Sequence, residues 1–221
     1  MRDEPEGNEY LSLQNIVTSD MPTQQFSQRV KEYLQQPVES RLQRLASTPD
    51  ELGQVIKGHS DVTLSHRPGP KKWSAKEVVC HLRDIEELVI MRFHLMLVAD
   101  EPRVFVAGVQ PSDPGKWGID DQVPCPSDPD RWAEERQYQR NDAFLALSAF
   151  CRRRREVITL FRRLTPEQWQ RGCVFPDDRR LTFEGWTAAM AAHDDGHLAQ
   201  LQHALASAAL ISEGTSQARR S

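Results

Sequence analysis

The chain has 221 residues, of which 38% are hydrophobic, so it holds enough apolar side chains for a buried core. Its formal charge of -4 argues against a general nucleic-acid binder, since the phosphate backbone rewards excess positive charge, and it favours small-molecule or protein partners. The four cysteines form no C-x-x-C pair and no apolar run resembles a signal peptide, so we expect a cytoplasmic protein. No apolar run is long enough to cross a bilayer, so we do not expect membrane insertion.

The first part of the chain changes character near Thr23. Residues 1–22 are rich in charge, proline and glycine, so we expect an N-terminal arm outside the folded domain. Helical spacing covers 23–45, and Pro37 is expected to kink or restart that helix because proline lacks a backbone N–H. Thr48-Pro-Asp-Glu51 has the form of a capping box with proline at the first helical position, which predicts a separate short helix that Gly58 closes.

A second capping box, Ser74-Ala-Lys-Glu77, opens a long helix that meets no helix breaker before Asp100-Glu-Pro102. His81 falls on the apolar stripe of this helix and is expected to point into the interior. The other members of the stripe are Val78, Leu82, Ile85, Leu88 and Val89.

The next segment, 101–130, is interrupted by six prolines and three glycines, so we expect no regular element in it. A connection of this length predicts a crossover between two long helices rather than a tight turn. Long ordered loops of this kind often form part of a substrate pocket.

Helical spacing returns over 131–164 and predicts the third long helix. It contains the run Arg152-Arg-Arg-Arg155. Because consecutive residues point to different sides of a helix, we interpret the run as a solvated face. The alternative is that one or two of the arginines guide a carboxylate-bearing thiol or substrate.

A turn-rich stretch leads to the fourth long helix, for which Thr182 is the predicted N-cap and which is expected to end before Glu213. Four long helices without a convincing strand predict an all-α bundle. We expect one domain over 23–210, with a C-terminal tail at 211–221.

His193 and His197 lie four residues apart in the fourth helix and therefore share one face. That face is apolar, so both rings are expected to point inward. With His81 they offer three nitrogens to one interior, and three protein ligands with open positions are typical of a catalytic or substrate-binding metal site. The alternative is a metal-free polar core.

Three polar residues near these histidines are further candidates. Asp84 lies one turn after His81 and is a candidate catalytic proton carrier, and Asp194 follows His193; for both, the alternative is a solvated carboxylate. Gln200 either lines the pocket and contacts a cofactor or packs between helices. Four other histidines are expected at the surface or in ordinary packing, namely His59, His66, His94 and His203.

Three segments carry a family pattern: Lys72-Trp-Ser-Ala-Lys-Glu-Val-Val-Cys-His-Leu82, Asp130-Arg-Trp-Ala-Glu-Glu-Arg-Gln-Tyr138 and His193-Asp-Asp-Gly-His-Leu-Ala-Gln200. In this order they resemble the DinB-like (YfiT-like) family of the DinB superfamily, over about Val38 to Ala208. The resemblance implies a four-helix bundle with up-down-down-up topology and a long crossover loop between helices 2 and 3. It also implies a divalent metal (nickel, zinc or iron) at His81, His193 and His197, and a homodimer.

Members similar in pattern include S-transferases that use low-molecular-weight thiols. The resemblance therefore implies a metal-dependent enzyme that transfers a small thiol to electrophilic small molecules, with the metal favouring the thiolate. A metal-bound hydroxide would instead give a hydrolase. A third interpretation is a stress-associated protein that binds a metal or ligand without turnover.

Overall fold

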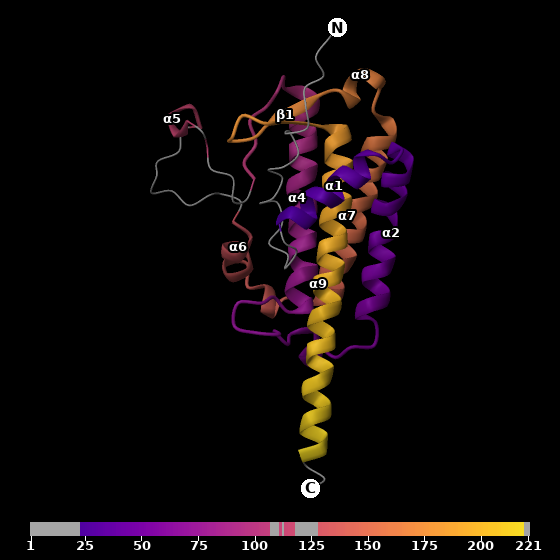
Figure 1. Cartoon of the computed structure of the whole chain (residues 1–221), viewed down its shortest axis with the longest axis vertical. Coiled ribbons are helices and arrows are strands. Elements are labelled where there is room, and N and C mark those ends of the chain that lie inside the picture. The colour runs from indigo at the N-terminus through magenta and orange to yellow at the C-terminus, as the bar shows by residue number, and fades with distance from the viewer. Residues whose placement is uncertain (1–22, 107–110, 112, 118–127, 219–221) are drawn as a thin grey trace.

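The computed structural model describes residues 23–106, 111, 113–117 and 128–218, and the predicted four-helix bundle is confirmed (Figure 1). The bundle helices are α2 (Val38–Ile56), α4 (Ala75–Val98), α7 (Ala143–Arg163) and α9 (Phe183–Ala218). The shorter elements are α1 (Thr23–Leu34), α3 (Asp61–Leu64), α5 (Pro114–Trp117), α6 (Pro129–Glu135), the 3-10 helix η2 (Tyr138–Arg140), α8 (Pro166–Trp169), β1 (Gly172–Val174) and β2 (Arg180–Thr182). The arm expected at 1–22 lies outside the described residues.

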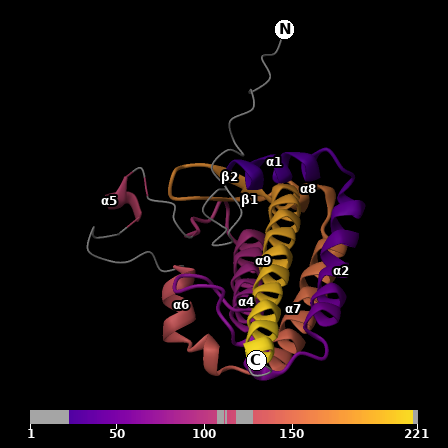
Figure 2. The same cartoon turned by 60° about the horizontal axis from the view of Figure 1, so that its bottom comes forward.

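The helix directions give the up-down-down-up topology. Helices α4 and α7 are parallel. Arg153 donates to the carbonyl of Arg83, and farther toward the C-terminal end of both helices Phe161 packs on Phe93. Helices α2 and α9 are parallel to each other and antiparallel to the first pair, in the ring order α2, α9, α4, α7 (Figure 2). Since α4 and α7 run the same way, the chain between them has to return along the bundle, which explains the long crossover.

Three local signals in the sequence are confirmed. Ser74 accepts a hydrogen bond from the Glu77 backbone N–H, and the Glu77 carboxylate accepts one from the Ser74 N–H, so the capping box opens α4. Pro37 separates α1 from α2. Thr182 accepts a hydrogen bond from the Gly185 N–H at 3.2 Å, at the start of α9.

The short helix predicted at Thr48 is wrong, because α2 continues through Pro49 to Ile56. Proline removes the N–H that would bind the carbonyl four residues earlier, which is that of Leu45. The side chain of Arg154 on α7 donates to this carbonyl at 3.1 Å. A partner from another helix therefore replaces the hydrogen bond that proline deletes, and Thr48 is buried inside the helix rather than capping one.

The single helix predicted over 131–164 is also wrong. The chain breaks after α6, where Gln137 adopts a left-handed backbone conformation with φ of 50°. Helix α7 starts only at Ala143, with the Asp142 carboxylate accepting from two backbone N–H groups at 2.8 Å each. Asp142 is an N-cap that the helical periodicity conceals.

Three smaller differences concern the connections and the end of the chain. Within the stretch expected to lack regular structure, Pro114–Trp117 forms one helical turn. Strands β1 and β2 pair as an antiparallel hairpin, and three residues are too few to show an alternating pattern. The fourth helix was expected to end before Glu213 but reaches Ala218, since one interior glycine weakens a helix by about 1 kcal/mol without ending it.

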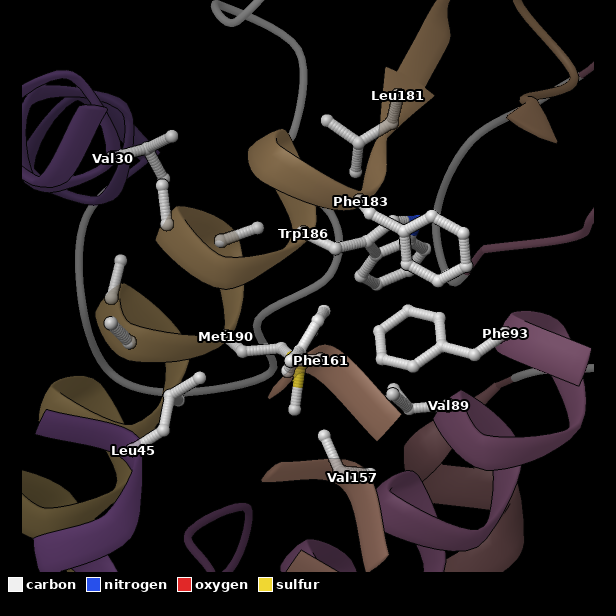
Figure 3. Close-up of a cluster of buried hydrophobic side chains, with 14 of the residues drawn as sticks. Val30, Leu45, Val89, Phe93, Val157, Phe161, Leu181, Phe183, Trp186 and Met190 are labelled. Atoms are coloured by element: carbon white, nitrogen blue, oxygen red, sulfur yellow. The ribbon is translucent and has the colours of Figure 1, made fainter. Parts of the chain in front are cut away.

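Two apolar clusters fill the bundle. One contains the aromatic rings of Phe93, Phe161, Phe183 and Trp186, with Phe93 at 5.1 Å from Phe161 and 5.7 Å from Trp186 between ring centroids (Figure 3). The other lies around Trp73, Tyr138 and Phe150. Along α9, His193 and His197 fall between the two clusters, whereas His81 of α4 lies among residues of the second cluster. No helix in the described part of the chain is long and apolar enough to cross a membrane.

Candidate metal centre

Three histidines from two helices meet inside the bundle. His81 projects from α4, and His193 and His197 project from α9, with one ring nitrogen of each within 4.8 Å of the others. The rings are almost fully removed from solvent, at 0%, 4% and 0% exposed respectively. Because four residues make about one helical turn, α9 presents its pair on one face, and α4 supplies the third ring from the opposite side.

The protonation of His197 follows from Gln200. The side-chain oxygen of Gln200 lies 2.8 Å from Nδ1 of His197, and an amide oxygen can only accept. Nδ1 therefore carries the proton, and the lone pair is on Nε2. That nitrogen faces Nε2 of His193 at 3.1 Å. A histidine that binds a metal through one ring nitrogen usually donates the N–H of the other to a neighbouring acceptor, which fixes its tautomer.

His81 has no such arrangement. Neither of its ring nitrogens has a hydrogen-bond partner among the described residues, although the ring is fully buried. Leaving a buried polar atom unpaired costs about 1–3 kcal/mol. A metal-free polar core would need to satisfy these nitrogens, so the unpaired ring favours a ligand that lies among the three histidines.

Burial sets the charge of the cluster. It lowers the pKa of His81 and of His193 well below the usual histidine value, and the neighbouring His197 lowers both further. Burial lowers the pKa of His197 to about 4, even though the hydrogen bond to Gln200 acts in the opposite direction. All three imidazoles are therefore neutral at pH 7, which is the form that donates a lone pair to a metal.

Trp73 covers one side of the cluster. Its indole ring lies 4.8 Å from His81 and stacks over His197 at 6.3 Å, between ring centroids. Its Nε1–H donates to the carboxylate of Asp130 in α6 at 3.0 Å. The end of the crossover is thus attached to the wall of the histidine cluster through one side chain.

A buried ion cluster lies beside His193. The Arg154 guanidinium binds the Glu86 carboxylate at 2.6 and 2.8 Å and the Asp194 carboxylate at 2.5 and 3.1 Å. Asp194 also accepts from the Thr48 hydroxyl at 2.6 Å. A cavity of about 30 Å³, enough for a water molecule, touches His193, Glu86 and Arg154. The interpretation of the arginine run as a solvated face is therefore wrong for Arg154.

Asp84, proposed from sequence as a proton carrier, is buried among other partners. Its carboxylate accepts from Arg83 at 2.7 Å and from the Tyr138 hydroxyl at 2.8 Å, and Arg136 lies at 2.8 Å. Burial alone would raise the pKa of Asp84, but these three partners outweigh it and lower the pKa. Asp84 is thus ionised and held by three groups that do not belong to the histidine cluster.

The other histidines and the described cysteines do not belong to the cluster. His94 and His203 are exposed, and His59 and His66 are partly buried. Burial raises the pKa of the Cys80 thiol to about 12 and that of Cys173 to about 11. Helical periodicity could not identify Trp73, Glu86 or Arg154 as neighbours of the site, because it does not report which side chains meet across helices.

Comparison with known proteins supports the same architecture. A family model of the DinB superfamily matches residues 29–201. The structure of YfiT from Bacillus subtilis, described as a probable metal-dependent hydrolase with an unusual four-helix bundle topology, aligns with a TM-score of 0.62 at 21% identity. The alignment covers 87% of this chain and 95% of YfiT. At that identity the likeness shows a shared fold. No protein of curated function matches.

Proposed function

The chain belongs to the DinB superfamily, and on this premise we propose that it is a metal-dependent enzyme whose ion is held by His81, His193 and His197. The observation that carries the proposal is the convergence of three buried, neutral imidazoles, one of which has no hydrogen-bond partner among the described residues. Imidazole ligands suit nickel, zinc and iron, and three of them leave positions for water or substrate. When bound, such an ion would act as a Lewis acid that lowers the pKa of a coordinated thiol or water.

The reaction we propose is transfer of a small thiol to an electrophilic small molecule. In this reaction the thiolate sulfur forms a bond to the electrophilic carbon, the leaving group departs with the bonding electrons, and the thiol proton passes to solvent. Cys80 and Cys173 are buried with raised pKa values, so neither supplies a thiolate at neutral pH. Burial also raises the pKa of Cys151, so none of the described cysteines favours the thiolate, and a separate low-molecular-weight thiol is the sulfur donor that we propose. The family resemblance also supports a homodimer, and the scattered cysteines support a cytoplasmic location.

Hydrolysis is the second candidate, and the observation that favours it is the shared fold with YfiT. The chain's own residues would act alike in both reactions. Gln200 holds the proton on Nδ1 of His197, Trp73 keeps water from one side of the rings, and Arg154 holds α4, α7 and α9 together beside His193. The two reactions differ only in the nucleophile.

A paired assay tests this proposal. Metal-loaded protein is incubated with a chromogenic aryl halide, with and without a small thiol, and separately with a chromogenic ester. We expect thiol-dependent consumption of the halide that falls at least about 100-fold in His197→Ala, since loss of a Lewis acid removes several kcal/mol of transition-state stabilisation. The matched control is His203→Ala, an exposed histidine on the same helix. Ester cleavage without thiol would select the hydrolase, and bound metal without either activity would overturn the enzyme proposal.

The role of Gln200 gives a separate prediction. Gln200→Leu removes the acceptor that fixes the His197 tautomer, so we expect metal affinity to fall about 10–100-fold. Competition with a coloured chelator measures the change. Gln202→Leu, on the exposed side of α9, serves as the control and should bind metal like the wild type. Equal affinities in the two variants would show that Gln200 does not orient the ring.

A further inference from the structure

The six arginines of α7 separate by face. Three of them pair with acids: Arg153 with Glu87, Arg154 with Glu86 and Asp194, and Arg162 with Glu39. The other three, Arg152, Arg155 and Arg163, form no ion pair with any residue that the structure describes. Three of the six positive charges on this helix are therefore paired with acids of neighbouring helices, and the other three have no ion-pair partner among the described residues.

All three unpaired arginines line the same groove. It is an open hollow of about 620 Å³ lined by residues of α4 and α7, which pack against each other, and by Gln168 of α8. His94 contributes from α4, and Glu156 is the only acid among the lining residues. Leu97, Leu160 and Leu164 add an apolar surface. A hollow of this volume with a few convergent polar groups is typical of a small-molecule site.

The spacing of the charges suggests the shape of the ligand. Arg152, Arg155 and Arg163 lie on one stripe of α7, and the first and last are eleven positions apart, which corresponds to about 16.5 Å along the helix at 1.5 Å per residue. Three guanidinium groups against one carboxylate leave an excess of positive charge. Like charges on neighbouring turns repel each other, so an anion in the groove would relieve that repulsion.

We propose that this groove binds an elongated small organic polyanion, with two or more phosphate or carboxylate groups on an apolar body. The guanidinium fork pairs bidentately with either group, and the leucines accept the apolar part. None of the residues lining the groove is one of the three histidines or lines the cavity beside His193. The groove is thus a second site, and its occupancy does not depend on the metal proposal.

Isothermal titration calorimetry at physiological salt tests the groove, with inorganic tripolyphosphate and citrate as the two probes. We expect saturable binding of at least one probe, weakened at least about tenfold by Arg155→Glu, which places a carboxylate among the remaining arginines. Arg162→Glu changes the net charge equally on the same helix but outside the groove, and should change affinity less than about twofold. Circular dichroism verifies the fold of each variant, and Arg163→Glu replaces Arg155→Glu if the latter does not fold.

The probes distinguish the two sources of the anion. Tighter binding of tripolyphosphate assigns a phosphate-bearing ligand, and tighter binding of citrate assigns a polycarboxylate. Absence of saturable binding by either probe would overturn the proposal. Equal weakening by Arg155→Glu and Arg162→Glu would also overturn it, because that result reports attraction to the whole protein rather than to the groove.

Discussion

Protein purified without chelator or immobilised nickel is expected to carry about one divalent ion per chain, and the His197→Ala variant almost none. His197 supplies the ring nitrogen whose lone pair is already directed into the cluster by Gln200, and two remaining histidines make a far weaker site. Elemental analysis by mass spectrometry measures the stoichiometry and identifies the ion. His81→Ala and His193→Ala are expected to behave in the same way.

The control for this experiment is on the same helix. His203 is exposed and lies six residues after His197, so His203→Ala should keep the wild-type metal content. Circular dichroism should show similar helix content in all variants, since the two apolar clusters are left intact. A folded wild type without any metal would contradict the proposal and favour the metal-free polar core.

Removing Arg154 should cause a large loss of stability. We expect Arg154→Met to lower the free energy of unfolding by about 3–5 kcal/mol, because the Glu86 and Asp194 carboxylates would stay buried without their shared cation. The Leu45 carbonyl, which has no N–H partner from Pro49, would lose its donor as well. Burial already raises the pKa of Glu86 despite the adjacent guanidinium, so part of the lost stability returns if Glu86 becomes protonated in the variant.

Urea denaturation followed by circular dichroism measures this loss. Arg152→Met provides the matched control, since Arg152 is exposed on the same helix and its replacement should change stability by no more than about 0.5 kcal/mol. Arg154→Lys should recover only part of the stability, because an ammonium cannot reproduce the guanidinium's simultaneous contacts with two carboxylates and a carbonyl. Similar midpoints for Arg154→Met and Arg152→Met would show that the ion cluster contributes little.

The same cluster connects stability to the candidate metal centre. Arg154 contacts α2 through the Leu45 carbonyl, α4 through Glu86 and α9 through Asp194, which is next to His193 in sequence. Arg154 therefore fixes the position of α4 relative to α9, the two helices that carry the histidines, although its own helix α7 carries none of the three. Neither the arginine run nor the isolated acids in the sequence indicated this link.

Local signals in the sequence were sufficient for the start of α4, the break before α2, the start of α9 and the shared face of His193 and His197. The Ser74 capping box, the break at Pro37 and the start at Thr182 depend on hydrogen bonds or a missing N–H within a few residues, so they can be read without knowing the fold. The spacing of His193 and His197 likewise depends on a single helix. Both rings point inward because both residues lie on the apolar stripe of that helix.

Contacts between segments far apart in the sequence decided the course of α2 and the pairing of the buried side chains. Helix α2 continues through Pro49 because Arg154, more than a hundred residues later, binds the carbonyl that proline leaves unpaired. Contacts with other helices likewise decide that His81 has no hydrogen-bond partner among the described residues. They also decide which arginines of α7 form ion pairs. The sequence by itself determined that there are four long helices and that the three imidazoles point inward, since helical period and capping are local. Only the tertiary structure decided how the buried charges are paired, because pairing depends on distances between helices that no sequence spacing encodes.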